Sequence, residues 1–451
     1  MESGIRLPQR DRQILRIAVP SIVSNITVPL LGLVDVAITG HLGAAAYIGA
    51  ISIGSMVFST TYWLFGFLRM GTSGLTSQAL GHRNLNECSG LLKHSLAIAF
   101  TISAVLIVLQ VPLRELGLLI MDPTDEVRRL TTTYFNICIW GAPAMLGLFS
   151  LNGWFIGMQN SRIPMAVAIT QNIMNIIASL FLVYGLGMKV EGVATGTLVA
   201  QWGGFLMAVG LCWHYYRKVL KRNQQLTDGE QRSTEKHKQP VADSRRFFRV
   251  NSDIFLRTLC LVSVLLFFTS AGSRQGEVIL AVNTLLMQLY LLVSYVMDGF
   301  ANAAEAMSGK NWGARNRQAF RQTVTHCFVW GCACTAIFTL LYIIGGKAFL
   351  RLLTDEPSVV SASREYVGWA YIVPACSLAA FIWDGVFIGI TASRQMLTSS
   401  FLAAIVFFVV YATAISPLGN HGLWLAFVCY MVTRGLTQTF LFRKICKSAQ
   451  M

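Results

Sequence analysis

One carboxylate lies inside the first long apolar run of the chain. The run extends from Val19 to Gly40, and Asp35 is its only acidic residue. An ionised side chain in the hydrocarbon core of a bilayer costs at least about 2.5 kcal/mol, so an acid in such a position is a functional candidate by default. Burial disfavours the charged form of a carboxyl group. The chemistry that this residue could perform is therefore the uptake and release of a proton or a cation.

Two prolines lie in the same run, at Pro20 and Pro29. A proline removes one backbone N–H and crowds the preceding turn, so a helix through this run is weakened ahead of the acid. We interpret Asp35 as a titratable switch on a helix that bends near Pro29, with Pro20 as a second weak point.

Polar side chains recur at helical spacing in two later apolar runs. Asn172, Asn175 and Ser179 stand at i, i+3 and i+7 and share one helix face. Thr197 and Gln201 stand at i and i+4 and share another. Amide and hydroxyl oxygens of this kind can surround a protonated carboxyl group or a hard cation.

Further acids lie in apolar runs of the second half. Asp298, Asn302 and Glu305 stand at i, i+4 and i+7, and Asp384 lies in a later run. These acids form a second or competing ion site, or else they line a wet cavity or hold helices together. Both interpretations stay open. Asp298, Glu305 and Asp384 are secondary candidates, together with Gln201 and Arg69.

Composition places these residues in an integral membrane protein. Of 451 residues, 54% are hydrophobic and 13% are charged, against about 25% charged in a soluble domain. Apolar runs separated by turn residues predict twelve transmembrane helices. With both termini in the cytoplasm, the basic residues crowd the cytoplasmic loops, above all the segment 217–250. The net charge of +15 therefore orients the chain in a lipid bilayer and does not indicate nucleic-acid binding.

Enzymatic and metal-dependent functions find no support in the sequence. The ten cysteines fall mainly in apolar runs, and Cys332 and Cys334 lack a histidine partner and ligand spacing. We find no nucleophile elbow, no His-Glu-x-x-His and no phosphate-binding loop. We expect no cofactor, no metal and no enzyme activity, and the absence of an ATP site points to an ion gradient as the energy source.

The two halves of the chain repeat one another. The motif at Gly81–Asn84 recurs at Gly313–Asn316, and the motif at Gly153–Gly157 recurs at Gly385–Gly389, both at an offset of 232 residues (81 to 313, 153 to 385). Repeats of six helices each are related by an axis along the membrane normal and enclose a cleft. We expect an all-α polytopic protein of two pseudo-symmetric six-helix bundles, with lobes 1–216 and 251–451 joined by a cytoplasmic linker, 217–250.

We assign two arginines, Arg69 and Arg434, to the predicted membrane spans. The offset puts Arg69 level with Ala301, about one turn from Glu305. An Arg69–Glu305 pair would latch the cytoplasmic side shut. In the other interpretation Arg69 reaches the membrane interface with its long side chain.

Five stretches carry a resemblance to a known family. They lie at Pro20–Asp35, Leu68–Thr76, Met297–Ala301, Asp384–Gly389 and Leu418–Trp424. Together they resemble the multidrug and toxic compound extrusion (MATE) transporters, in the DinF-like bacterial branch, over nearly the whole chain. The resemblance implies a twelve-helix, two-lobed exporter that moves amphipathic, often cationic, drugs outward in exchange for entering H⁺ or Na⁺. It also implies a bacterial cytoplasmic (inner) membrane location, and we expect a monomer.

The same resemblance assigns roles to residues. Asp35 matches the family's functional aspartate, facing Asn175, Thr197 and Ser179, the last where relatives often carry a second aspartate. One carboxylate suffices for a proton, whereas Na⁺ prefers more charge, so H⁺ coupling is favoured over Na⁺. The alternative function is a lipid-linked oligosaccharide flippase of related fold, which requires a markedly basic cavity.

Overall fold

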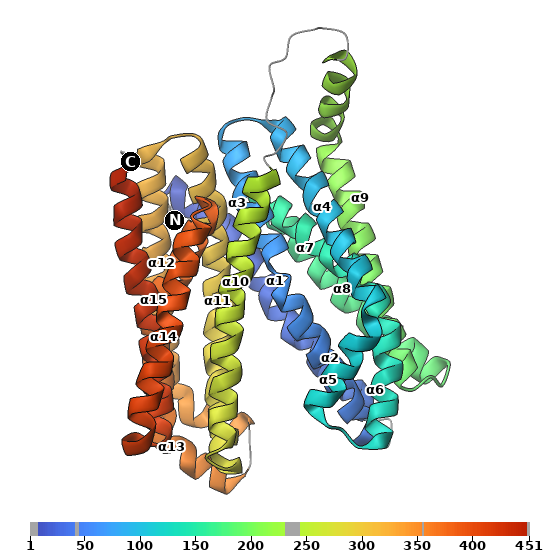
Figure 1. The fold of residues 1–451 in the computed structure, drawn as a ribbon, viewed down its shortest axis with the longest axis vertical. Helices are drawn as coiled ribbons and strands as arrows, with labels where there is room; N and C mark the ends of the chain where they lie inside the picture. The colour runs from blue at the N-terminus through green and yellow to red at the C-terminus, as the bar shows by residue number, and fades with distance from the viewer. Residues whose placement is uncertain (1–7, 41–44, 231–243, 354–355, 449–451) are drawn as a thin grey trace, which may run out of the picture. The chain divides into compact units, whose positions relative to one another are not determined.

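The computed structural model describes residues 8–40, 45–230, 244–353 and 356–448. Within the helices, the side chains of residues 28–33, 35, 36, 40, 45, 220–230, 244, 346–353 and 448 lie outside the described part. Every regular element of the described chain is a helix (Figure 1), which confirms the predicted all-α class.

Fifteen α-helices and two short irregular turns make up the described chain. The turns are the 3-10 helix η1, Ile139–Gly141, and the π-helix η2, Phe181–Gly185. The α-helices are α1 (Gln9–Gly40), α2 (Ala45–Leu64), α3 (Phe67–Gly81), α4 (Leu85–Val108), α5 (Gln110–Met121), α6 (Asp125–Cys138), α7 (Ala142–Gly157), α8 (Arg162–Leu180), α9 (Val190–Glu230), α10 (Ser244–Ser273), α11 (Glu277–Gly313), α12 (Arg317–Leu353), α13 (Pro357–Gly389), α14 (Ser393–Leu418) and α15 (Asn420–Ser448).

Eleven segments of the described chain are long and apolar enough to cross a membrane. Two of them join consecutive helices, because α2 with α3 forms the segment Ala46–Gly81 and α6 with α7 forms Asp125–Gly157. The 32-residue α1 also exceeds the length of about 20 residues that a bilayer requires. Together these segments agree with the predicted twelve transmembrane helices.

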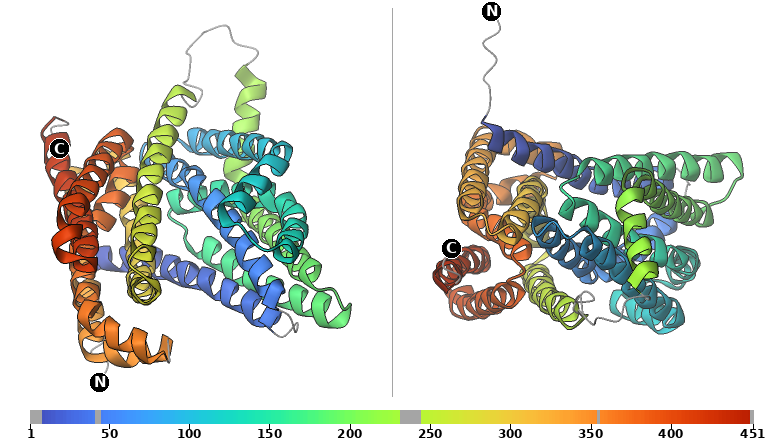
Figure 2. Two further views of the ribbon diagram at one scale, coloured as in Figure 1. Left: turned by 60° about the horizontal axis from the view of Figure 1, so that its bottom comes forward. Right: turned by 90° about the horizontal axis from the view of Figure 1, so that it is seen from above.

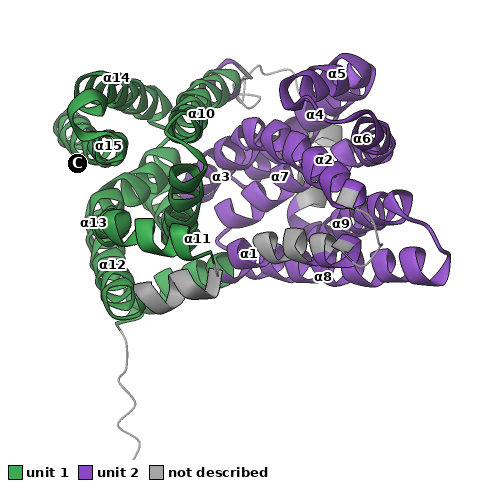
Figure 3. Cartoon of the chain, turned by 90° about the horizontal axis from the view of Figure 1, so that it is seen from below, with its two compact units in different colours: residues 1–22, 248–451 green, residues 23–247 purple. Residues whose placement is uncertain are grey.

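The chain divides into two compact units (Figure 3). Unit 1 comprises Met1–Ile22 and Phe248–Met451, and unit 2 comprises Val23–Phe247. In unit 2, α8 packs on α9, and α7 packs on α3 and α4. In unit 1, α13 packs on α11, α12 and α15, and α14 and α15 run side by side (Figure 2). The division differs from the expected lobes 1–216 and 251–451 in that residues 8–22 of α1 pack with the second half of the chain.

The same helix crossing occurs in both units. A Cβ atom added to Gly153 of α7 would come within 3.0 Å of the backbone carbonyl oxygen of Arg69 in α3. A Cβ atom added to Gly385 of α13 would meet the carbonyl oxygen of Ala301 in α11 in the same way. Both pairs are related by the offset of 232 residues (69 to 301, 153 to 385). The repeated glycines therefore permit a close backbone approach that a larger residue would prevent.

The repeated turn motif ends one helix and begins the next. Arg83 and Arg315 adopt positive φ angles of 58° and 52°, as the residue after a helix commonly does. The backbone N–H of Asn84 donates to Ala79 O, and that of Asn316 donates to Asn311 O. The side chains of both asparagines then accept a hydrogen bond from the N–H three residues later, at 3.1 and 3.0 Å. The motif is therefore a combined helix stop and N-cap.

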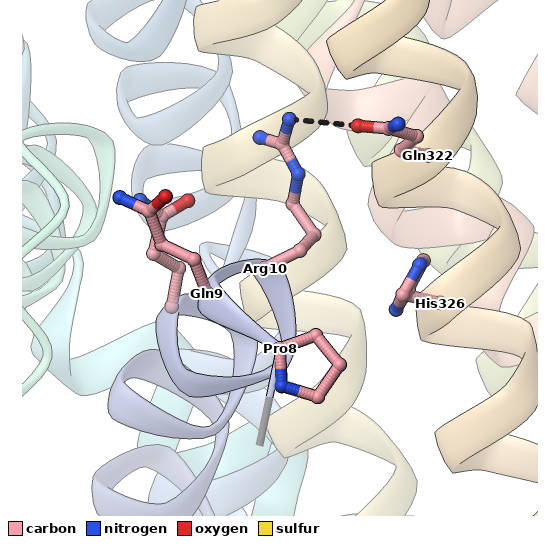
Figure 4. Close-up of a pocket in the computed structure, with 6 residues that line it drawn as sticks. Pro8, Gln9, Arg10, Gln322 and His326 are labelled. Carbon is pink, nitrogen blue, oxygen red and sulfur yellow. Dashed lines mark hydrogen bonds between the residues drawn. The ribbon is translucent and has the colours of Figure 1, made fainter. Parts of the chain in front are cut away.

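The first turns of α1 are held in unit 1 by polar contacts with α12. Asp11 Oδ1 lies 2.7 Å from His326 Nδ1 and accepts a hydrogen bond from Trp330 Nε1 at 3.0 Å. Arg10 Nη2 donates to Gln322 Oε1 at 3.1 Å (Figure 4). The hydrogen bond to His326 lowers the pKa of Asp11 below its ordinary value of 3.8, with burial opposing and Trp330 assisting the shift. These residues border a cavity of about 420 Å³ that is lined by Pro8, Gln9, Arg10, Gln13, Gln322 and His326.

The contact of Asp11 predicts a pH-dependent contribution to stability. Because folding lowers the pKa of this carboxyl group, its contribution is present above pH 3.8 and is lost as the pH falls through the lower folded value. Asp11→Asn should therefore lower the thermal unfolding midpoint at pH 6, and the gap to the wild type should be smaller at pH 3. A gap of equal size at both pH values would show that the charge of Asp11 is not responsible.

The cap of α12 can be tested by truncation. Asn316→Ala removes the side-chain acceptor at the start of α12 and should cost about 1 kcal/mol of stability. The matched control is Gln318→Ala, an exposed position in the same turn. The measurement is the thermal unfolding midpoint in detergent, and equal midpoints for the two variants would contradict the assigned cap.

Candidate functional site

The polar cluster expected in the first half forms where α8 packs on α9, within unit 2. Asn175 Nδ2 donates to Thr197 Oγ1 at 3.0 Å. Asn175 and Ser179 are both fully buried. Gly196 leaves room for the Ser179 hydroxyl, since a Cβ atom on this glycine would come within 3.0 Å of Ser179 Oγ. The structure therefore brings together the two helix faces that the spacing had predicted.

The same face of α8 contacts α1. Asn172 Nδ2 donates to the backbone carbonyl oxygen of Thr27 at 2.8 Å, and Thr27 Oγ1 donates to Ser24 O at 2.7 Å. The backbone of α1 is helical through both Pro20 and Pro29. The side chains of Asp35 and Pro29 lie outside the described residues, so their proposed roles stay predictions.

Three buried oxygen atoms of this region make no hydrogen bond within the described residues. They are Asn175 Oδ1, Ser179 Oγ and Gln201 Oε1, the last of which lies against Gly141 of η1. Buried polar atoms are nearly always hydrogen-bonded, and an unmatched one costs about 1–3 kcal/mol. The region therefore offers acceptors for a group that carries a proton or a positive charge.

The secondary candidate Asp384 has a different environment. It lies in α13, and its carboxylate forms ion pairs with Arg257 of α10 and Arg434 of α15. Gln438 Nε2, one turn after Arg434, donates to the second carboxylate oxygen at 2.6 Å. A carboxylate with these partners is already neutralised, which disfavours a role in binding a transported cation.

Arg257 corrects the assignment of basic residues made from the sequence. We had placed only Arg69 and Arg434 within spans, but Arg257 lies in the span Arg245–Ser273 and is 4% exposed. Arg257 was not recognised as a residue of this span because basic residues crowd the segment just before it. The spacing of Arg434 and Gln438, i and i+4 in an apolar helix, was the signal that could have revealed this cluster.

The remaining secondary candidates lie on α11 and α3. Asp298 accepts a hydrogen bond from Ser294 Oγ at 3.4 Å, and Glu305 is 1% exposed. Asn302 is also buried. Arg69 belongs to unit 2 and Glu305 to unit 1, so the latch between them stays a prediction.

Comparisons with known proteins place the chain in a family. The MatE family profile matches residues 20–181 and 254–413. The DNA damage-inducible protein F of Escherichia coli (strain K12) is 34% identical over 444 residues, which cover 97% of this chain and 93% of the relative. The probable multidrug resistance protein NorM of Idiomarina loihiensis is 21% identical and covers 95% of this chain and 93% of its own length.

A solved structure confirms the fold. The crystal structure described as MATE in the bent conformation superposes with a TM-score of 0.83 at 19% identity, and it covers 98% of this chain and 96% of its own. Proteins of this family are membrane transporters and not enzymes, as the sequence had led us to expect. The chain therefore belongs to the MatE family of multidrug and toxic compound extrusion transporters, and its sequence is DinF-like.

Proposed function

We propose that this MATE transporter exports amphipathic, often cationic, drugs in exchange for entering protons, and that Asp35 carries the proton. The observation that carries the proposal is the set of unmatched buried oxygens on α8 and α9, beside a helix whose apolar run holds a single acid. The relatives that are named for multidrug resistance support small-molecule export.

The contact between Thr27 and Asn172 supports the position of Asp35. Three membrane-spanning segments separate α1 from α8, so these two helices cross the membrane in the same direction. Eight residues beyond the contact, about 12 Å along each helix, α1 reaches Asp35 and α8 reaches Leu180. Parallel axes of α1 and α8 would bring Asp35 level with Ser179 and within one to two turns of Asn175.

The oxygen atoms available in this region favour the binding of a proton over the binding of Na⁺. A sodium site needs several oxygen ligands and gains from a second negative charge, and α8 contains no acidic residue. Asn175 Oδ1 is a neutral acceptor without a hydrogen bond in the described chain. Such an acceptor stabilises the protonated form of a carboxyl group, because only that form can donate.

The coupling follows from the change of charge. A proton from outside neutralises Asp35, whose O–H then donates to the α8–α9 cluster, and α1 bends near Pro29. The bend draws Thr27 O away from its helical partner, while the Asn172 amide continues to satisfy that carbonyl. The rearrangement shrinks the cavity of unit 2 and expels the drug, and release of the proton to the cytoplasm resets the helix.

The assembly and location complete the proposal. We place the protein in the bacterial inner membrane as a monomer with both termini in the cytoplasm. The flippase alternative gains one observation, the buried pair Arg257 and Arg434, but Asp384 neutralises part of their charge. A cluster of this size is too weakly basic for a pyrophosphate-linked lipid.

Replacing Asp35 tests the proton carrier. Asp35→Asn should abolish efflux driven by a pH gradient, because an amide cannot titrate, while the folded protein stays in the membrane. The measurement is dye efflux from proteoliposomes with a proton gradient, a sodium gradient or neither. The control is Asp125→Asn, the same change at an exposed acid in the first turn of α6. Full efflux in Asp35→Asn, or efflux by the wild type under a sodium gradient alone, would contradict the proposal.

Removing the acceptor tests the cluster. Asn175→Leu keeps the number of side-chain heavy atoms but deletes Oδ1, together with the Nδ2 donor to Thr197. The protonated form of Asp35 then loses a hydrogen bond of about 1 kcal/mol, and half-maximal efflux should move about 0.5–1 pH unit towards acid. Gln171→Leu, one turn earlier on α8, is the matched amide control and should leave the profile in place. If neither variant changes the pH dependence of efflux, Asn175 is not part of the coupling site.

A further inference from the structure

Three charged side chains from three helices meet inside unit 1. Arg257 of α10 and Arg434 of α15 both direct Nη2 to Oδ2 of Asp384 in α13. The exposed fraction is 4% for Arg257, 5% for Arg434 and 7% for Asp384. Within the described residues, Asp384 is the only acid that pairs with either arginine. We call these three residues the charge cluster.

The charge cluster carries one excess positive charge. An isolated charge buried away from water is unfavourable unless a partner neutralises it. Two arginines share one carboxylate here, and the Nε atoms of both make no hydrogen bond within the described residues. An arginine presents its N–H donors in a planar fork that suits an oxyanion. The excess charge and the unused donors therefore both call for an anion.

The repeat shows that the helix crossing itself does not need the charge cluster. In unit 2 the residue equivalent to Asp384 is Asn152, and the residue equivalent to Arg434 is Trp202. The glycine after each of Asn152 and Asp384 makes the same close approach to a backbone carbonyl. Since the equivalents of Asp384 and Arg434 in unit 2 are uncharged and the close approach is still made, the charges of unit 1 call for another explanation.

Within the described residues, two other acids of unit 1 hydrogen-bond to serine hydroxyls and form no ion pair with Arg257 or Arg434. Asp253 of α10 accepts a hydrogen bond from Ser393 Oγ at 2.7 Å, and Asp298 of α11 accepts one from Ser294 Oγ. The guanidinium of Arg434 lies 5.8 Å from the ring centroid of Tyr430. Tyr430 in turn belongs to a group of packed rings with Phe407 and Phe427. The charge cluster thus combines an unneutralised cation with an aromatic surround.

We propose that the charge cluster binds the single negative charge of an amphipathic compound, a carboxylate or a phosphate ester. The oxyanion accepts hydrogen bonds from the unused guanidinium donors, and the apolar part of the compound packs on the rings. Asp384 keeps the two arginines converged when no anion is bound. The transporter therefore accepts anionic or zwitterionic compounds besides cations. This site is independent of proton coupling through Asp35.

The test compares variants that differ in the charge of the cluster. The wild type and the double variant Asp384→Asn/Arg434→Gln have a net charge of +1, whereas Arg434→Gln alone has none and Asp384→Asn alone has +2. The probes are decanoate, decyl phosphate and decyltrimethylammonium, which share one tail, added below their micellar concentrations to the full chain in nanodiscs of neutral lipid. Binding is followed by tryptophan fluorescence, with thermal unfolding as the check of folding.

Anion affinity should follow the charge of the cluster. Arg434→Gln should weaken binding of the anionic probes by about tenfold or more, as the loss of a charge-assisted hydrogen bond does, and Asp384→Asn should strengthen it. The double variant should bind them nearly as the wild type does, even if Asp384→Asn alone fails to fold. Preference for decanoate or for decyl phosphate identifies the oxyanion class.

Two outcomes would overturn the site. If Arg434→Gln binds the anions as well as the wild type does, the arginines do not recognise charge. If it weakens all three probes equally, or if the double variant is no better than Arg434→Gln, the cluster only holds helices together. Asp35→Asn should retain anion binding while losing proton-driven efflux, so failure of this inference and failure of the proton proposal are separate results.

Discussion

A polar atom inside a bilayer must find its partner within the protein, because the hydrocarbon offers none. The interiors of both units are organised by this constraint. Unit 2 meets it with neutral groups, as in the hydrogen bond between Asn175 and Thr197. Unit 1 meets it with the charge cluster, in which Asp384 joins α10, α13 and α15. The two solutions have different chemistry, since neutral oxygen acceptors can hydrogen-bond to the protonated form of a carboxyl group, whereas a cluster with excess charge attracts an ion of opposite sign.

The internal repeat distinguishes residues that shape the backbone from residues that give each unit its polar interior. Gly153 and Gly385 let two helices approach closely, and this requirement is purely steric. The turns at Arg83 and Arg315 share one backbone conformation because each ends one helix and caps the next. The polar cluster of α8 does not repeat, since the position equivalent to Asn175 in the second half is Phe407, part of an aromatic group. Duplication therefore preserved the backbone crossings, while the interior side chains diverged.

Helix α1 contributes residues to both units. Its first turns are held in unit 1, where Asp11 contacts His326 and Trp330. Its later part belongs to unit 2, where Asn172 holds the carbonyl of Thr27. The contact at Thr27 lies two residues before Pro29, which removes one backbone N–H from α1. This arrangement supports a local bend as the response to protonation.

The sequence by itself determined the helical class, the repeat and the helix faces, because hydrophobic periodicity and turn chemistry are local properties. The face of α8 that carries Asn172, Asn175 and Ser179 was predicted in this way, whereas its pairing with α9 was implied only by the family resemblance. Only the tertiary structure decided which distant residues meet, as for Asp11 and His326, which are 315 positions apart. Arg257 lies just beyond the basic linker 217–250, and only the folded chain shows that its partner is Asp384. Partners of buried charges come from helices far apart in the chain, and spacing within one helix carries no information about them.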